Sequence, residues 1–575
     1  MIYILFTWIY ITAINYSIGS FIHSVISRSN EPKNQPIANF SLVCISGMLT
    51  TVFISTILCL FMPLAAFANC ILLLFAILSV LFNRKDLRKQ LKITKSGLIN
   101  TPIVFWILFL IFLAVFGYIS FQPSSHHDDG LYYSTSIKWL QEYGTVRGLV
   151  NLNPRIGYNS SWLILQALYG FAYLKKGLFN DLNGLLFLYV LIFAMGGIIK
   201  LIRGDRSLSV LMRAIFILPA IAFYRGRGSD WMMFNFNFIE SCTADLPVCL
   251  LIWIVFILFL ESASDPSKKS LVAFYSLLTI TIKLSAMPLL LLPLFFAVRP
   301  GNIKRIFYSA AMGLLLLSPW IIRNVLLSGY LLYPFPGLDL FHLSWKIPNQ
   351  FVKFQESAIM VMAADPTQSY GRPFAESVLQ WFPKWFSRQT IFQKTFFLST
   401  ITATLAFVVM GITMMIRQGI GFFSKYLFHI ILAATGVCGI SLWLLKGPDF
   451  RFGYGFMSIY CIFFLAILLN YFLKKKLQIV GWFSAVFIGA IGLFYYAREL
   501  IVVNKILLKP PIPYRMPEEM SEVHFPDGTI VYIVKHDDSW NAPLPVANEN
   551  EFKELNPSKI GVSIQEGFYC GRSRP

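Results

Sequence analysis

The chain has 575 residues, of which 56% are hydrophobic and only 13% charged, and its formal net charge is +20. A soluble domain carries about 25% charged residues, so this composition excludes a soluble enzyme, a disordered chain and a fibrous protein. We therefore expect a polytopic membrane protein with the lipid bilayer as a partner. Its basic residues would hold loops in the cytoplasm rather than bind nucleic acid.

The apolar segments begin with residues 1–22, which we expect to be a spanning helix rather than a signal peptide. No basic residue precedes this segment, and no small-residue cleavage site follows it. Further segments near the spanning length of about 20 residues recur along the chain, and some are short enough to be tilted, kinked or paired. The fourteen predicted spans are residues 1–22, 40–60, 63–82, 102–121, 182–202, 208–224, 245–261, 270–284, 286–299, 306–326, 391–416, 425–445, 454–472 and 477–497.

The basic loops predict the orientation of these spans. The loop 83–95 contains six Lys and Arg residues against the single acid Asp86, so we place it in the cytoplasm. The same side then holds the basic loops 200–206, 264–269, 299–305 and 474–478 and the residue Arg417. The opposite, outer side holds loops 122–181, 225–244, 327–390 and 446–453 and the tail from residue 499.

This orientation requires that the apolar stretch within 160–174 does not cross the membrane. Its apolar sequence WLILQALYGFAYL has thirteen residues, which is shorter than a span, so we expect an interfacial or partly buried helix.

Three regions follow from this division of the chain. Residues 1–99 form N-terminal transmembrane helices with a basic cytoplasmic loop, and residues 100–498 form the main transmembrane core. Residues 499–575 differ in composition, since 500–575 contain eight basic and ten acidic residues. We predict a small mixed α/β domain here, on the outer side, with strands over 529–536 and 559–565.

The first outer loop contains the run His126-His127-Asp128-Asp129, close to the end of a predicted span. A carboxylate at the membrane surface can take a proton from an acceptor hydroxyl while a lipid head group projects from the bilayer. Two other interpretations remain open. The pair of acids also fits a solvated turn or the cap of a helix over 131–143, and the whole run also fits a divalent metal site.

Four more charged residues lie near the outer face. Asp245 begins the segment 245–261, where an acid is ordinary helix capping. Lys283, Arg323 and Arg451 lie inside or at the edges of apolar segments. A charge in a membrane span is costly and is a functional candidate by default, although Lys283 also fits a structural ion pair.

The order of these motifs resembles that of the GT-C superfamily of membrane glycosyltransferases, which use polyprenyl-phosphate-linked sugar donors. The matching stretches are DDGLYY in the first outer loop, SCTADLP in the second, TIKLSAMPLLLLPL as a lysine-containing helix hairpin and PWIIRNVLLSGYLLYP at the exit of a later helix.

More narrowly, the chain is similar to a family of bacterial multi-pass membrane proteins. These share Asp-x-Gly-Leu-Tyr, then Arg-x-Gly-x-Asn-Ser-Ser-Trp and Pro-Asp-x-Arg-Phe-Gly, and a tail resembling SWNAPLP. That family has a cysteine before the tail tryptophan where this chain has Ser539, so we expect no disulfide there. The resemblance covers most of residues 100–575.

The resemblance implies an all-α, GT-C-like polytopic fold of about fourteen helices with a small α/β outer segment. The protein would lie in a bacterial inner membrane, with its active site facing the periplasm or exterior. It would be an inverting glycosyltransferase that moves a sugar from a polyprenyl-phosphate-linked donor to a cell-envelope glycan or lipid-linked acceptor.

Roles for individual residues follow from the same resemblance. Asp128 matches the first position of Asp-x-Gly-Leu-Tyr and would be the catalytic base, with Asp129 beside it as a second catalytic candidate. Arg323, Arg451 and Lys283 would stabilise the leaving phosphate, and Asp245 would line the cavity or help to hold a divalent metal, the one cofactor considered. The other substrate-binding candidates are Tyr132 and His127. Interface anchoring is expected of Trp345, Trp381 and Trp385, in preference to sugar stacking.

Two alternative functions share these substrates. A transporter or flippase of lipid-linked glycans would show matching halves and polar residues near the midplane, whereas here no halves match and the polar candidates gather at one face. A glycan polymerase would use lipid-phosphate substrates with arginines in place of an outer-loop acid.

Overall fold

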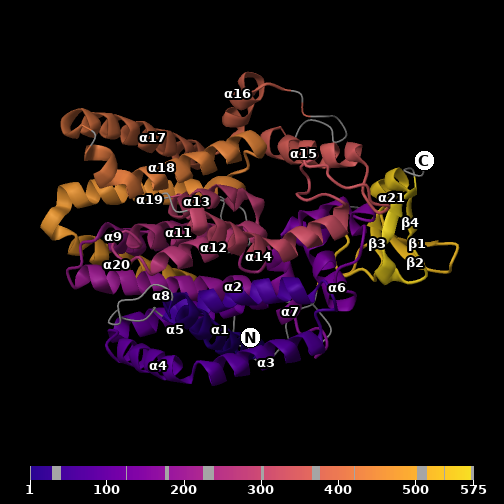
Figure 1. Cartoon of the computed structure of the whole chain (residues 1–575), viewed down its shortest axis with the longest axis horizontal. Coiled ribbons are helices and arrows are strands. Elements are labelled where there is room, and N and C mark those ends of the chain that lie inside the picture. The colour runs from indigo at the N-terminus through magenta and orange to yellow at the C-terminus, as the bar shows by residue number, and fades with distance from the viewer. Residues whose placement is uncertain are drawn as a thin grey trace.

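A computed structural model of the chain describes residues 2–28, 40–124, 126–174, 181–223, 238–298, 303–365, 374, 376–419, 421–500, 514–535 and 538–571. Most of these residues form helices that run side by side, with a small region of strands at one end (Figure 1). Within the described part, nine helices are long and apolar enough to cross a membrane. They are α1 (Ile2–Arg28), α2 (Phe40–Leu58), α5 (Ile103–Phe121), α8 (Leu182–Ile202), α14 (Ile303–Ser328), α17 (Ile391–Gln418), α18 (Gly421–Lys446), α19 (Phe450–Leu473) and α20 (Gln478–Leu500).

The other predicted spans are shorter helices, so the number fourteen is not confirmed. A helix of 17 residues is about 25 Å long, less than the roughly 30 Å of hydrocarbon in a bilayer. Apolar composition does not separate lipid-facing helices from helices buried in protein: in α11 every residue from Asp245 to Leu260 is buried. The shorter elements are α3 (Ala66–Phe82), α9 (Leu208–Ile215), α10 (Ile217–Phe223), α11 (Asp245–Glu261), α12 (Lys268–Ile282), η4 (Leu284–Leu290) and α13 (Leu291–Val298).

The basic loop 83–95 is itself helical, as part of α4 (Arg84–Ile99). It is bent by 89° from α3, and the pair would count as a tenth span if taken together. All six of its Lys and Arg side chains are exposed. At this end of the bundle Arg203 Nη2 donates to the carbonyl of Asn100 at 2.9 Å, which brings two of the predicted cytoplasmic loops together.

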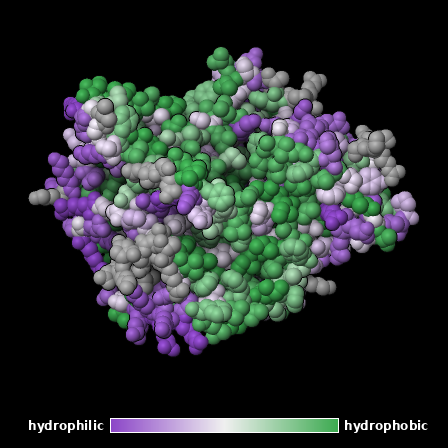
Figure 2. Space-filling view, in the orientation of Figure 1, coloured by the Kyte–Doolittle hydropathy of each residue, from purple (hydrophilic) through white to green (hydrophobic). Residues whose placement is uncertain are grey.

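The opposite end of the bundle is built from shorter elements. After α5 the chain forms the π-helical turn η1 (Asp129–Tyr133), α6 (Ser134–Glu142), η2 (Leu149–Asn151), η3 (Pro154–Tyr158) and α7 (Ser161–Tyr169), and later α15 (Asn349–Ala364) and α16 (Val378–Arg388). Helix α7 has nine residues, all of them buried, so the stretch within 160–174 is too short to span, as the predicted orientation requires. Hydrophobic residues cover the middle of the molecular surface, and hydrophilic ones gather toward its two ends (Figure 2).

The C-terminal segment packs beside α6 as a small α/β unit (Figure 1). Strands β1 (Met520–His524) and β2 (Ile530–Val534) are antiparallel with Val523 opposite Val531, and β3 (Val546–Asn548) is parallel to β2 with Ala547 opposite Ile533. Helix α21 (Glu549–Leu555) follows, and β4 (Pro557–Lys559) pairs with β5 (Phe568–Cys570).

The structure confirms the strand expected over 529–536 and shows that the one expected over 559–565 is wrong. Pairing ends at Lys559, and the chain then enters the short helix η7 (Ile564–Glu566). Ser563 and Glu566 form a reciprocal capping box at the start of η7, which satisfies backbone donors that a strand would have paired.

Candidate functional site

A cavity of about 270 Å³ lies among the loops that were predicted to share the outer side. We call it the outer cavity. Its wall comes from the first outer loop, the break between α12 and η4, helix α14, the region 333–363 and the turn between α18 and α19. The polar and aromatic residues that line it include Asp128, Tyr132, Tyr133, Arg155, Tyr158, Asn159, Ser160, Lys283, Arg323, Tyr333, Glu356, Trp443, Lys446, Asp449 and Arg451.

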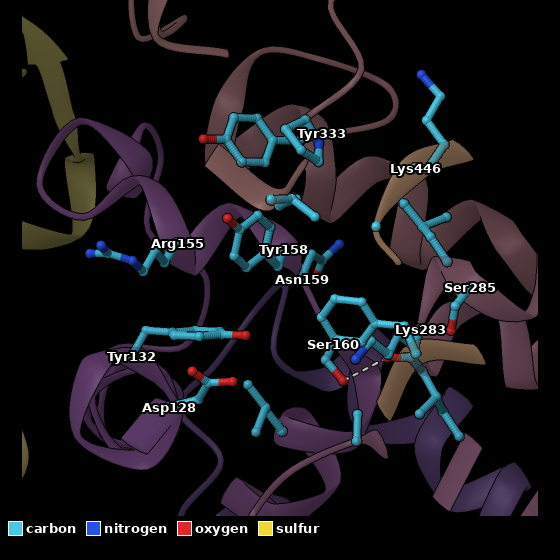
Figure 3. A pocket seen from close by; sticks show the side chains of 18 of the residues that line it. Asp128, Tyr132, Arg155, Tyr158, Asn159, Ser160, Lys283, Ser285, Tyr333 and Lys446 are labelled. Atoms are coloured by element: carbon cyan, nitrogen blue, oxygen red, sulfur yellow. Dashed lines mark hydrogen bonds between the residues drawn. The ribbon is translucent and has the colours of Figure 1, made fainter. Parts of the chain in front are cut away.

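Asp128 lies directly before the π-helical turn η1. Its carboxylate and the hydroxyl of Tyr132 are directed into the outer cavity (Figure 3). The Asp128 amide donates to His126 Nδ1 at 3.2 Å, and its carboxylate accepts a hydrogen bond from Arg451 Nη1 at 2.8 Å. Burial acts to raise the pKa of Asp128, but the charges of Arg451, His126 and Lys283 outweigh it, and the pKa lies below its ordinary value. Asp128 is therefore an ionised carboxylate at neutral pH.

Arg451 is held between two acids at the start of α19. Asp449 caps this helix through the Arg451 amide at 3.0 Å, and its carboxylate also lies 2.9 Å from Arg451 Nε. Arg451 was predicted to bind a phosphate, but Asp128 and Asp449 already compensate its charge within the protein. It positions Asp128 instead.

Lys283 lies where helix α12 stops. Its backbone is extended, with φ −156° and ψ 131°, between α12 and η4. Broken helices of this kind occur in membrane proteins where they line a cavity. The Lys283 ammonium pairs with Asp245, whose side chain is fully buried, and lies 4.0 Å from the centre of the Phe452 ring. Asp245 is therefore the partner of Lys283. Such an ion pair was one of the two interpretations of Lys283 drawn from the sequence.

Arg323 differs from the other basic residues of the outer cavity. It is 3% exposed, and its guanidinium donates to the side chains of Asn159 and Thr145, the second at 3.3 Å. Among the described residues no acid lies within ion-pair distance of it. A buried charge without a compensating partner costs several kcal/mol, and the described contacts of this guanidinium are to neutral side chains.

The position of Asn159 is fixed by its neighbours. Its side-chain amide donates to Asn324 Oδ1 at 2.7 Å and to the carbonyl of Trp320 at 3.0 Å. Both contacts lie on the same helix, α14, as Arg323. Asn159 also adopts a left-handed backbone with φ +46°, which Asn tolerates better than most residues. The buried cation is thus presented in one orientation.

Tyrosine rings form another wall of the outer cavity. The Tyr132 ring lies 4.4 Å from Tyr133 and 5.5 Å from Tyr158, and Tyr158 lies 6.2 Å from Tyr333. The Tyr158 hydroxyl donates to Gln355 at 3.1 Å. Aromatic walls with a few fixed polar groups are typical of small-molecule sites.

Three of the predicted site residues do not line the outer cavity: Asp245, whose pairing with Lys283 is described above, Asp129 and His127. The Asp129 carboxylate is fully buried and accepts from Ser124 and from the Cys242 amide, at 3.2 Å for the latter. Burial raises its pKa to about 7. It ties the first outer loop to the second, and its predicted catalytic role is not supported. His127 is 69% exposed and lies 3.8 Å from Asp538 of the C-terminal segment, so its predicted substrate contact is not seen either.

The metal hypothesis required the four side chains of residues 126–129 to converge. Instead the two carboxylates have the separate partners given above, and His127 faces the surface. Within the part of the chain that the structure describes, no three His, Cys, Asp or Glu side chains are grouped to hold a metal ion.

Trp381 and Trp385 are core residues rather than interface anchors, and Trp345 is half-buried. Trp381 and Trp385 are each 2% exposed. Trp385 donates to the carbonyl of Pro448 at 2.8 Å and stacks on Phe450. The indole of Trp345 donates to the carbonyl of Val325 at 3.1 Å. Trp385 therefore supports the turn that carries Asp449 and Arg451.

Several cavity residues were not singled out from the sequence. Arg155 and Asn159 belong to the Arg-x-Gly-x-Asn stretch of the resemblance, which was a usable signal. Tyr333 likewise belongs to the Tyr-Pro end of PWIIRNVLLSGYLLYP. Trp443 and Lys446 carried no comparable signal, because apolar residues precede them in sequence. The side chains of Arg155 and Lys446 point outward (Figure 3) and pair with Glu551 and Glu356, each at 2.9 Å.

Comparison with known proteins gives one match. A family model described as a domain of unknown function, DUF8201, matches residues 1–458. This range contains every residue that lines the outer cavity and ends before the C-terminal segment. No curated protein and no solved structure matches the chain.

Proposed function

The chain belongs to the DUF8201 family, and on this premise we propose that it is an inverting membrane glycosyltransferase of the GT-C type. It takes a sugar from a polyprenyl-phosphate-linked donor and adds it to a cell-envelope glycan or lipid-linked acceptor. The site faces the periplasm or exterior of a bacterial inner membrane. The observation that carries the proposal is one cavity lined by both an ionised carboxylate, Asp128, and a buried cation, Arg323, which has no ion-pair partner among the described residues.

Each group has one task in the proposed reaction. Asp128 accepts the proton of the acceptor hydroxyl as that oxygen attacks the anomeric carbon. The bond between this carbon and the phosphate oxygen breaks, and its electron pair leaves with the polyprenyl phosphate. The attack comes from the face opposite the leaving group, so the configuration inverts. Arg323 stabilises the charge that develops on the leaving phosphate.

The rest of the cavity supports the same assignment. Arg451 keeps Asp128 ionised, and therefore able to accept a proton, at neutral pH. The tyrosine wall offers flat apolar surfaces next to polar hydroxyls, as a sugar ring requires. Apolar residues of α15 and α18, including Ile359, Met362 and Leu442, line another part of the cavity. Met362 is 43% exposed and lines the cavity, and such apolar surface suits an isoprenoid chain.

A genetic experiment tests the role of Asp128. A deletion strain is complemented with Asp128→Asn or with Asp129→Asn as the matched control, at equal protein levels, and the surface glycan is analysed. We expect the glycan modification to be lost with Asp128→Asn and kept with Asp129→Asn. Normal glycan from Asp128→Asn would contradict the catalytic role.

A transporter of lipid-linked glycans is the second candidate, and the broken helix at Lys283 favours it, because transporters build binding sites from such breaks. Purified protein in lipid nanodiscs separates the two. A transferase releases free polyprenyl phosphate from the donor when an acceptor extract is added. A transporter leaves the donor chemically unchanged.

A further inference from the structure

The turn that carries Asp128 is held from outside by the C-terminal segment. The Trp540 amide and the Ser539 hydroxyl both donate to the carbonyl of Gly130, each at 3.0 Å. The Ser134 hydroxyl contacts the carbonyl of Trp540 at 2.7 Å in return. A Cβ atom at Gly130 would lie 2.5 Å from the Trp540 ring, so only glycine allows this approach.

The contact continues along α6. The hydroxyls of Thr135 and Ser539 lie 2.5 Å apart, and Lys138 Nζ donates to the carbonyl of Ala542 at 2.7 Å. Trp540 is buried and has a left-handed backbone with φ +36°. Such a conformation is unfavourable for a bulky residue and persists only where its surroundings impose it. The fit between the two segments is therefore specific.

A second contact reaches another element of the cavity wall, η3. Glu551 of α21 pairs with Arg155 of η3 at 2.9 Å, and the Phe568 amide donates to the carbonyl of Arg147 at 2.9 Å. The C-terminal segment thus contacts two elements of the cavity wall, η1 and η3, although it lies outside the range of the family match.

We propose that Ser539 and Trp540 are positioning residues that hold the η1 turn so that Asp128 faces both the cavity and Arg451. A π-helical turn is rare and is found mostly at functional sites. The Gly130 carbonyl within it is satisfied by the C-terminal segment. Without these contacts, the turn has fewer hydrogen-bond partners and the orientation of the Asp128 side chain is no longer fixed. The proposal rests on the proposed function in so far as Asp128 is the base.

The test uses the full chain in lipid nanodiscs. The variants are Trp540→Leu and Ser539→Ala, with Val562→Ala as the matched control, because Val562 lies in the same segment and is 90% exposed. Three quantities are measured: hydrogen exchange of residues 129–138, release of polyprenyl phosphate from donor, and binding of polyprenyl phosphate.

We expect exchange to be about tenfold faster and release about tenfold slower in both variants, since each loses buried hydrogen bonds or packing at η1. Binding of polyprenyl phosphate should stay within about twofold, because the described contacts of Arg323 and Asn159 are to residues outside the C-terminal segment. Unchanged exchange would show that the segment merely packs there. Faster exchange with unchanged release would overturn the positioning role.

A reversible cross-link gives the complementary result. The variant Thr135→Cys/Ser539→Cys places two thiols where the hydroxyls lie 2.5 Å apart, with each single cysteine variant as a control. Because Ser539→Cys removes the hydroxyl that holds Gly130, we expect the reduced double variant to release slowly, as Ser539→Ala does. We expect the oxidised variant to release no more slowly than the reduced one, because the disulfide keeps the segment docked. Loss on oxidation that reductant restores would show that it must move, which contradicts the proposal. If the unmodified protein neither binds nor releases polyprenyl phosphate, the proposed function fails, and the exchange comparison still decides whether the segment holds the turn.

Discussion

Charged residues are exposed at one end of the helical bundle and buried at the other. At the end that carries α4, the basic residues Arg84, Lys85, Arg88, Lys89, Lys92 and Lys95 are all exposed. At the cavity end, Asp128, Asp245 and Arg323 are buried, and Arg451 bridges two acids. Exposed charge sets orientation and is tolerant of change, whereas buried charge needs a partner. Substitutions at the two ends should therefore differ sharply in effect.

The largest expected effect is that of Arg323→Gln. This variant removes the buried cation and keeps an amide donor near the position of Arg323 Nε, the atom that contacts Thr145. We expect binding and release of polyprenyl phosphate to fall by about 10²-fold, with no loss of thermal stability. The measurement is a titration with polyprenyl phosphate beside a thermal unfolding scan. A loss of stability with unchanged affinity would show that the role of Arg323 is structural.

The ion pair of Lys283 and Asp245 should show a different pattern. Lys283→Met leaves the fully buried Asp245 carboxylate unpaired, so we expect a loss of about 3 kcal/mol in stability. The double variant Lys283→Met/Asp245→Asn removes both charges and should recover most of it. Chemical unfolding in detergent measures both. If the double variant is no more stable than the single one, the two residues do not act as a pair.

Arg451→Gln should change the pH dependence of activity. In the unmodified protein Arg451 helps to hold the pKa of Asp128 below its ordinary value, so the base is lost only in strongly acidic solution. Without Arg451, burial dominates and the pKa rises, so activity should begin to fall at a higher pH as the solution is acidified. A pH–rate profile of polyprenyl phosphate release shows this. An unmoved acidic limb would exclude Asp128 as the titrating base.

The smallest effect is expected at the α4 end. The variant Lys85→Gln/Lys89→Gln/Lys92→Gln removes three exposed charges and leaves three basic residues to hold the orientation. We expect the release of polyprenyl phosphate to stay within about twofold of the unmodified protein. A loss of release comparable to that of Arg323→Gln would show that substitutions at the two ends do not differ in effect.

Much of this site was predictable because its signals are local. Lys283, Arg323 and Arg451 are charges in apolar surroundings, and Asp128 follows a predicted span. Residues of this kind gather at one end because a bilayer leaves them few other places. The structure brings these four and Tyr132 to the wall of one cavity.

The remainder depends on contacts that are distant in sequence. Arg451 and Asp128 are 323 residues apart, and no local sequence pattern predicts their pairing. Asp128 and Asp129 are adjacent, yet the π-helical turn sends their carboxylates to different partners. The fourteen predicted spans are not confirmed for a related reason, since the apolar composition of α11 reflects burial among other helices.

The most direct measurement is a structure of the protein in lipid nanodiscs with a non-hydrolysable polyprenyl-phosphate sugar bound. We predict that the phosphate lies within hydrogen-bonding distance of the Arg323 guanidinium, with the anomeric carbon toward Asp128 and the isoprenoid chain between α15 and α18. A phosphate bound elsewhere, with Arg323 left without an anion, would contradict the assignment of this cavity.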